Sequence, residues 1–236
     1  MTQAEIQAQE LARRIRSMGS ERNRAGMARF GINTARAAGV GMAPLRPLAR
    51  AHRGDHALAL ALWDAGLHEA RILACMIDDP RQADREQLER WALDLDSWDL
   101  TDQLCNKLVA RSPLAWELAS VWAAREEEFV RRAGFSLIAQ LAVHHKKVPD
   151  EEFLRFFALI EAHACDARNF VKKAVNWALR QLGKRSSFLR GHAEATADRL
   201  LAQGSAPARW IARDALRELA FARSGSRREK KVSAVS

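Results

Sequence analysis

Apolar and polar positions recur at helical spacing along nearly the whole chain. Apolar residues separated by three and four positions indicate helices that bury one face. No segment alternates apolar and polar residues convincingly enough to predict a strand. The pattern predicts helices over roughly residues 3–18, 44–52, 56–65, 67–77, 83–95, 98–111, 113–124, 127–145, 151–164, 167–184, 187–203 and 207–221.

Local signals mark where some of these helices begin and where the chain is irregular. Residues whose side chains can cap a helix precede three of the predicted starts, namely Asp55, Asp150 and Ser186. The segment 31–43 contains three glycines and is predicted to be a loop.

The order of these elements predicts an all-α fold. Short helices joined by short turns, in pairs of about 35–45 residues, are typical of HEAT-like repeats that stack into a curved α-solenoid. Stacking of this kind leaves a concave face, and a basic concave face suits a nucleic-acid duplex. A globular all-α bundle is the alternative. We expect one repeat domain over residues 1–223 and a basic, disordered tail over residues 224–236.

Composition places the chain among folded proteins and excludes several classes. Of 236 residues, 48% are hydrophobic and 28% are charged, which argues against global disorder. No apolar run reaches the length of a membrane span, and no signal peptide is recognisable, so we expect a cytoplasmic protein associated with the nucleoid through DNA. Three isolated cysteines without a CxxC exclude a zinc ribbon or a disulfide framework, and all three are predicted to be buried.

Charge is distributed unevenly along the chain. The formal net charge is +9, yet residues 55–104 alone carry net −8. The segments 1–54, 105–224 and 225–236 carry +7, +7 and +3. Such a field favours a polyanionic partner such as nucleic acid, although a basic balance alone is weak evidence.

The predicted helix 167–184 places an aromatic residue among cations. Trp177 lies on the side opposite the apolar stripe, together with Lys173, Arg180 and Lys184. Two interpretations stay open. The indole covers the next helix, or it lies against nucleic acid while the cations contact phosphates.

The predicted helix 98–111 combines an aromatic residue with a carboxylate. Trp98 and Asp102 are four positions apart and therefore share a face, with Asn106 nearby. This pair suits a cationic ligand or a ligand that develops positive charge. The alternative is an exposed aspartate beside a partly buried tryptophan.

The predicted helix 127–145 places an arginine beside small residues. Arg132 shares a face with Ser136, and Gly134 permits close helix packing. Arg132 could reach a phosphate, or it could be a solvated surface arginine.

Several segments together resemble a known family, the DNA alkylation repair glycosylases of the AlkD type. The similar segments are MARFGINTARAAGVGMAPLRPLA (27–49), LWDAGLHEARILACMIDDP (62–80), SWDLTDQLCNKLV (97–109), FVRRAGFSLIAQL (129–141) and FVKKAVNWALRQLGK (170–184). The resemblance covers about residues 20–220, and its specific parts are the WDxxD and KAxxWxLR elements.

The resemblance implies a fold, an activity and a set of site residues. Members fold as right-handed superhelices of HEAT-like repeats and hydrolyse the N-glycosidic bond of 3-methyladenine and 7-methylguanine type purines, without base flipping. By motif position, Asp102 corresponds to the catalytic aspartate, Trp98 and Trp177 to the sugar-contacting tryptophans, and Arg132 to the phosphate-binding arginine. Arg180 is implied as a further contact to the DNA backbone.

One position departs from the family pattern. Ser97 replaces the first of two aromatic residues before the aspartate, which puts the range of lesions and the efficiency in doubt more than the chemistry.

The chemistry agrees with these residue types. An N3- or N7-alkylated purine is cationic and leaves as a neutral base, while positive charge moves onto the deoxyribose. A fixed carboxylate stabilises that charge and positions water. The expected partner is double-stranded DNA with alkylated bases, and the expected protein is a monomer that needs no metal, cofactor or membrane.

Two rival functions remain. A non-catalytic member of the same fold would bind bent or branched DNA without releasing a base. A helical-repeat scaffold would instead bind a protein partner in its groove.

Overall fold

The structure is a computed structural model that describes the backbone of residues 1–233 and the side chains of residues 1–221. The described residues form helices and turns, with no strand among them. The predicted all-α class is therefore confirmed. The chain divides into two compact units, Met1–Ala115 and Trp116 onward, and each is described by itself.

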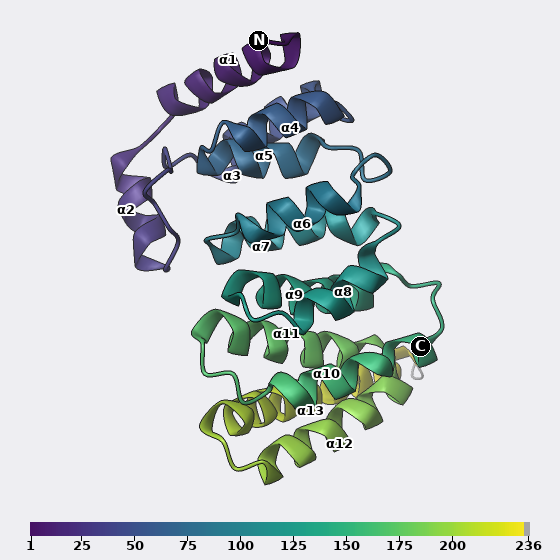
Figure 1. The fold of residues 1–236 in the computed structure, drawn as a ribbon. Coiled ribbons are helices and arrows are strands. Elements are labelled where there is room, and N and C mark those ends of the chain that lie inside the picture. Colours follow the sequence, from purple (N-terminus) through teal and green to yellow (C-terminus); the bar gives the residue numbers. More distant parts are fainter. Residues whose placement is uncertain (234–236) are drawn as a thin grey trace. The chain divides into compact units, whose positions relative to one another are not determined.

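Unit 1 is built from seven α-helices followed by two short helical segments of other types (Figure 1). Helix α5 contacts α1, α3, α4 and α7, and α1 also contacts α4. The helices are α1 (Gln3–Ser17), α2 (Glu21–Arg29), α3 (Met42–Ala51), α4 (His56–Asp64), α5 (His68–Ile77), α6 (Arg85–Leu93) and α7 (Trp98–Gln103).

Two stacked tryptophans form the centre of the unit 1 core. The rings of Trp63 in α4 and Trp91 in α6 lie 4.1 Å apart and nearly parallel, and both side chains are fully buried. The indole nitrogen of Trp63 donates to Asp94 at 2.8 Å, and the Arg71 guanidinium lies over the same ring. Burial of both rings stabilises the unit, because aromatic side chains bring a large apolar area out of water.

Helix α2 is absent from the sequence prediction. Ser20 caps it by accepting a hydrogen bond from the backbone amide of Asn23, but none of its own residues is buried. A helix without a buried face has no apolar periodicity, so the pattern could not reveal it. The predicted loop 31–43 ends at Met42, where α3 begins.

The predicted helix 98–111 is wrong in its detail. It consists of α7, a π-helical segment over Leu104–Leu108 and a 3₁₀ turn over Val109–Arg111. A π-turn contains one more residue than an α-turn, so the assumed spacing of 100° per residue does not hold past Gln103. Segments of this kind are frequent at functional sites.

Unit 2 is centred on α11, which contacts α9, α10, α12 and α13. Its α-helices are α8 (Ala115–Ala123, whose first residue belongs to unit 1), α9 (Glu128–His144), α10 (Arg155–His163), α11 (Asn169–Arg185), α12 (Ser187–Ala202) and α13 (Ala206–Ser233), with a 3₁₀ turn over Asp150–Phe153.

Gly134 allows the backbones of α8 and α9 to approach each other closely. A Cβ atom at this position would lie 2.1 Å from the backbone nitrogen of Ala123. Real Cβ atoms do not approach a backbone so closely, so the predicted role of Gly134 in close packing is confirmed.

Two of the three predicted caps are confirmed. Asp55 and Ser186 accept hydrogen bonds from the amides of Leu58 and Leu189. Asp150 is not a cap, because it begins the 3₁₀ turn. Its carboxylate instead accepts hydrogen bonds from Ser186 and, at 2.8 Å, from Arg185, and these bonds lower the pKa of Asp150.

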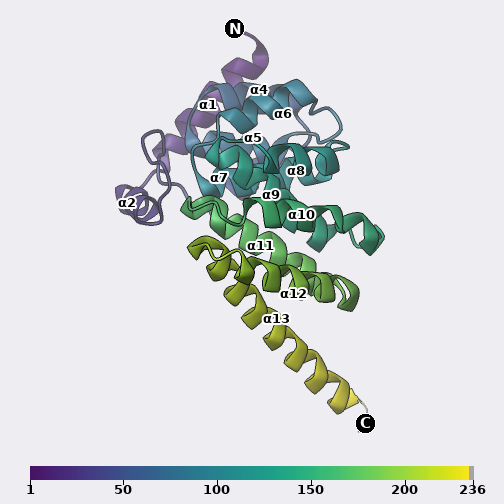
Figure 2. The same ribbon diagram turned by 60° about the horizontal axis from the view of Figure 1, so that its bottom comes forward.

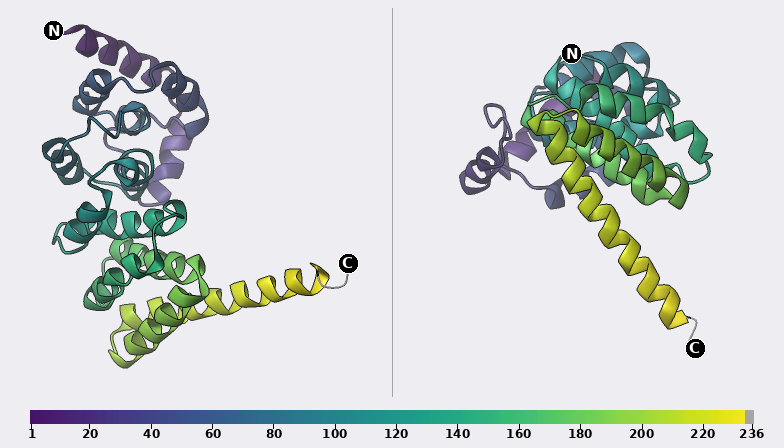
Figure 3. Two further views of the ribbon diagram at one scale, coloured as in Figure 1. Left: turned by 90° about the vertical axis from the view of Figure 1, so that its right-hand side faces the viewer. Right: turned by 90° about the horizontal axis from the view of Figure 1, so that it is seen from below.

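Helix α13 is longer than predicted and extends past the other helices of unit 2 (Figures 2 and 3). It continues through residue 233, so the predicted tail from residue 224 begins inside a helix. The last residues of that tail, 234–236, lie outside the described residues.

Two of the three cysteines are buried, as predicted. Cys75 and Cys105 are buried, whereas Cys165 is exposed and its thiol contacts Gln203. The prediction that all three are buried is wrong for Cys165, which lies just after α10 in the turn that leads to α11.

Candidate functional site

The residues that the motifs single out lie on three helices in two units. Trp98 and Asp102 belong to α7 in unit 1. Arg132 belongs to α9 in unit 2, and Trp177 lies on α11 with the three predicted cations. Each group is described within its own unit.

Trp98 and Asp102 occupy the two ends of the short helix α7. Both side chains are half-buried, and their spacing of four residues puts them on one face, as predicted. The indole nitrogen of Trp98 donates to the carbonyl oxygen of Phe30 at 3.0 Å. The loop after α2 therefore fixes the orientation of the Trp98 ring.

Ser97 attaches the start of α7 to the loop before α3. Its buried hydroxyl accepts a hydrogen bond from the amide of Asn33 at 2.9 Å and donates to Asp96. The Asn33 side chain also donates to Asp96, at 2.8 Å. The residue that departs from the family pattern thus positions the helix that carries Trp98 and Asp102.

His68 supports α7 from α5. Its Nε2 lies 2.9 Å from the Asp99 carboxylate, and its side chain is only 3% exposed. Burial lowers the pKa of His68, but the hydrogen bond and the charge of Asp99, aided by Glu69 and Asp96, outweigh burial and raise it. A protonated His68 is therefore favoured beside Asp99, and the pair holds α7 against α5.

Glu69 is a fully buried carboxylate that fixes the loop before α3. It accepts hydrogen bonds from the amides of Ala38, Gly39 and Val40 at 2.7–3.0 Å. Neither Glu69 nor His68 was among the residues predicted from the sequence pattern. The available signal was two ionisable residues at the start of a helix that is otherwise nearly continuously apolar.

Arg132 links α9 to the start of α11. Its Nη1 donates to the carbonyl oxygen of Phe170 at 2.9 Å, and the residue is 6% exposed. Phe170 and Trp177 are two turns apart and share a face of α11. The alternative of a solvated surface arginine is therefore wrong.

Trp177 is half-buried and is held by its own helix. The side-chain amide of Gln181 is oriented so that its oxygen faces two donors. This oxygen accepts hydrogen bonds from the Trp177 indole nitrogen at 3.1 Å and from Lys184 at 3.2 Å. This bond fixes the indole edge, as the Phe30 carbonyl does for Trp98.

The predicted cations of α11 differ in their surroundings. Lys173 is exposed, whereas Lys184 forms an ion pair with Glu218 of α13 at 2.6 Å. Arg180 pairs with Glu218 and, at 3.4 Å, with Asp214. The α13 carboxylates therefore neutralise part of this basic face.

A second ion-pair network joins α9 to the turn before α11. Arg131 and Arg168 both bind the Asp166 carboxylate, at 2.8 and 2.6 Å. Burial raises the pKa of Asp166, but these hydrogen bonds outweigh burial and lower it to about 2. Nearby, burial and the positive charge of Arg131 lower the pKa of His163.

Unit 1 thus offers an aromatic face and a carboxylate on α7, and unit 2 offers an aromatic face and guanidinium groups on α9 and α11. Among the described residues, no group of three or more metal-ligating side chains is placed to hold an ion. Over the same residues, no helix combines the length and the apolar composition needed to cross a membrane. Guanidinium groups can bind the phosphates of a sugar-phosphate chain, and aromatic faces and carboxylates can stabilise positive charge.

Comparisons with known proteins identify the fold and the family of the chain. No curated protein sequence matches the chain significantly. A solved structure described as "a new family of proteins related to the HEAT-like repeat DNA glycosylases with affinity for branched DNA structures" has the same fold. The TM-score is 0.72 at 20% identity over 80% of this chain and 81% of the other, which confirms the HEAT-like repeat fold. The sequence profile of the DNA alkylation repair enzyme family matches residues 11–219, and the chain belongs to this family.

Proposed function

We propose that the protein is a DNA glycosylase that hydrolyses the N-glycosidic bond of alkylated purines in duplex DNA and leaves an abasic site. The observation that carries the proposal is the shared face of Trp98 and Asp102 on α7. Family membership supports a role in the repair of alkylated DNA.

The carboxylate of Asp102 supplies the electrostatic part of the reaction. Alkylation at N3 or N7 makes the base cationic, so the C1′–N bond breaks with both bonding electrons moving to the base, which leaves neutral. Positive charge then grows on the deoxyribose, and a fixed carboxylate stabilises it. Water attacks C1′ and loses a proton, which gives the abasic sugar.

The tryptophans and the cations position the substrate. Trp98 and Trp177 offer aromatic faces to sugar C–H groups that become more positive in the transition state. Arg132, Lys173, Arg180 and Lys184 contact flanking phosphates and fix the register. The anchored indole edges reduce the ordering needed when DNA binds.

Release of free base from duplex DNA that contains 7-methylguanine tests the proposal. The unaltered protein should release the base, and Asp102→Asn should lose at least 100-fold of the rate, on the order of what one transition-state electrostatic contact provides. Asp64→Asn removes an exposed carboxylate of the same unit and should leave release unchanged. Circular dichroism and duplex binding verify that Asp102→Asn is folded and still binds.

Binding of branched DNA without catalysis is the second candidate. The structural neighbour is described as having affinity for branched DNA, which favours this alternative. It predicts tight binding to a four-way junction, no base release by the unaltered protein and binding that survives Asp102→Asn. That combination would replace the glycosylase proposal.

A further inference from the structure

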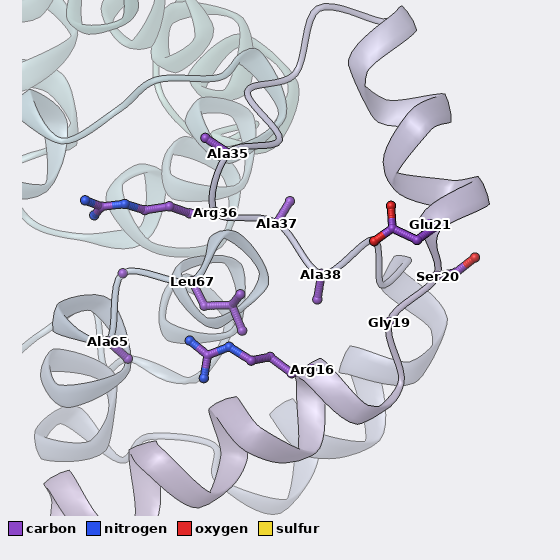
Figure 4. A pocket seen from close by; sticks show the side chains of 11 residues that line it. Arg16, Gly19, Ser20, Glu21, Ala35, Arg36, Ala37, Ala38, Ala65 and Leu67 are labelled. Carbon is purple, nitrogen blue, oxygen red and sulfur yellow. The ribbon is translucent and has the colours of Figure 1, made fainter.

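A cavity of about 610 Å³ lies in unit 1, apart from α7 (Figure 4). Its walls are the end of α1, the first residues of α2, the loop 35–38 and the turn 65–67 between α4 and α5. Most of the lining side chains are small, because alanine and glycine dominate these turns. The small residues leave room for a ligand, and the volume falls within the usual range for ligand pockets.

Two arginines give the cavity its charge. Arg16 and Arg36 are exposed, and among the described residues no carboxylate forms an ion pair with either guanidinium. Figure 4 shows both guanidinium groups on the side of Ala65 and Leu67, with Glu21 on the other side. The cavity therefore has a cationic end whose guanidinium groups form no ion pair with a carboxylate among the described residues.

The nearest acidic side chains are already engaged. Glu21 forms an ion pair with Arg24 at 2.8 Å. The adjoining hollow, which shares Arg36, contains Asp94 and Asp96. Asp94 accepts hydrogen bonds from Trp63 and Arg71, and Asp96 accepts from Asn33 and Ser97.

The turn between α4 and α5 is shaped to receive the Arg36 side chain. Gly66 has φ +69°, a conformation that favours glycine. A Cβ atom at Gly66 would lie 3.3 Å from Nη1 of Arg36, so the guanidinium lies directly over a turn without a side chain. The absence of a side chain at position 66 keeps the Arg36 guanidinium beside the cavity.

Hydrogen bonds hold the loop that carries Arg36 in place before any ligand binds. The amide of His68 donates to the Arg36 carbonyl oxygen at 2.8 Å, and the amide of Ser20 donates to Ala38 at 3.0 Å. Glu69 holds the next residues of the loop. A fixed wall lowers the entropy lost on binding.

We propose that this cavity binds a phosphate group. Guanidinium groups match phosphate oxygens in geometry and charge, and two of them can share one phosphate. The phosphate comes from the DNA strand or from a free nucleotide. The DNA source rests on the proposed function, whereas the phosphate chemistry of Arg16 and Arg36 does not.

The position of the loop favours the DNA source. Asn33 binds Ser97 at the start of α7, and Arg36 is only three positions after Asn33. Three residues span at most about 11 Å, and each strand carries one phosphate per about 3.4 Å of duplex axis. A strand that contacts Trp98 can therefore present a phosphate to Arg36 within a few nucleotides.

Titration with inorganic phosphate at constant ionic strength tests the cavity itself. Nuclear magnetic resonance of the arginine Nε–H groups should show shifts for Arg16 and Arg36 with phosphate but not with chloride. The shifts should vanish in the double variant Arg16→Gln/Arg36→Gln. They should persist in Arg14→Gln/Arg53→Gln, which removes two exposed arginines of the same unit outside the cavity. No phosphate-specific shift in the unaltered protein would overturn the proposal.

The salt dependence of duplex binding identifies the source of the phosphate. If the cavity holds one DNA phosphate, the slope of log affinity against log salt should fall by about 0.9 in the cavity variant and change less in the control. If the unaltered protein binds phosphate but the two variants have equal slopes, the DNA source is overturned in favour of a free nucleotide. Titration with dAMP then tests the nucleotide directly. If the unaltered protein binds no DNA, the proposed function fails while the phosphate titration still decides the cavity.

Discussion

The surroundings of α7 in unit 1 and of α11 in unit 2 are stabilised in different ways. Buried polar groups stabilise the region around α7: Glu69 is fully buried, and the His68 side chain is 3% exposed. Around α11, the ion pairs of Arg180 and Lys184 with α13 are about 30% exposed. Both helices carry a tryptophan whose indole nitrogen is hydrogen-bonded.

The difference indicates which of the two regions can exchange its hydrogen-bond and ion-pair partners. A buried carboxylate cannot lose its amide donors without a large cost, because no water replaces them. An exposed ion pair contributes little, since water and salt compete with it. The α7 region is therefore fixed before DNA arrives, whereas the α11 cations can leave the carboxylates of α13 for phosphates.

Neutralisation of Glu69 should give the largest effect. In Glu69→Gln an amide NH₂ replaces an acceptor that faces backbone N–H groups, so we expect a loss of about 2–4 kcal/mol in the free energy of unfolding. The amides of residues 38–40 should also lose protection against hydrogen exchange. Urea unfolding and hydrogen exchange measure the two effects.

Glu218→Gln is the matched control in unit 2. It removes one carboxylate from partly exposed ion pairs, so its cost should stay below about 1 kcal/mol. Equal losses in the two variants would contradict the distinction between a fixed and an exchangeable region.

Two histidines should respond to pH with opposite sign. The pKa of His68 is raised, so its contribution to stability is complete below about pH 6.5 and is lost as pH rises through its folded-state pKa. The pKa of His163 is lowered, chiefly by burial. Its contribution is complete above about pH 6.5 and is lost as pH falls through its folded-state pKa.

Urea unfolding of His68→Gln and His163→Gln from about pH 5 to about pH 9 measures these contributions. The deficit of His68→Gln relative to the unaltered protein should shrink above about pH 6.5, and that of His163→Gln should shrink below it. Deficits that do not change with pH would show that titration of these histidines does not alter the free energy of unfolding.

The sequence predicted the features that depend on local pattern. Helical periodicity located nearly all helices, and spacing by four placed Trp98 and Asp102 on one face. It could not reveal α2, which buries nothing, or the π-segment after α7, which depends on packing. These failures share one cause, because the missing information lies in tertiary contacts rather than in neighbouring residues.

The candidate site shows the same limit. Motif positions and helix faces predicted Arg132, Arg180 and Lys184 as site residues, but not that Arg132 binds the Phe170 carbonyl or that Glu218 pairs with the other two. The partners are about 35 residues or more away in sequence. Side-chain periodicity reports which face a residue occupies and not which residue of another helix meets it.

Neutralisation of the α13 carboxylates should give the smallest of these effects, and it should be seen as a gain in binding. Asp214→Asn/Glu218→Gln frees Arg180 and Lys184, so duplex affinity should rise several-fold and its salt dependence should steepen. Fluorescence anisotropy over a range of salt concentrations measures both. Glu194→Gln/Asp198→Asn makes the same charge change at the same spacing on α12.

The α12 control distinguishes the release of the α11 cations from the general effect of a more positive net charge. If only the α13 variant gains affinity, the ion pairs compete with DNA for the α11 cations. If both variants gain equally, long-range attraction accounts for the effect and the cations of α11 do not contact phosphates. A loss of affinity in the α13 variant alone would mean that Asp214 and Glu218 hold Arg180 and Lys184 in their binding positions, and the α11 region would then be as fixed as α7.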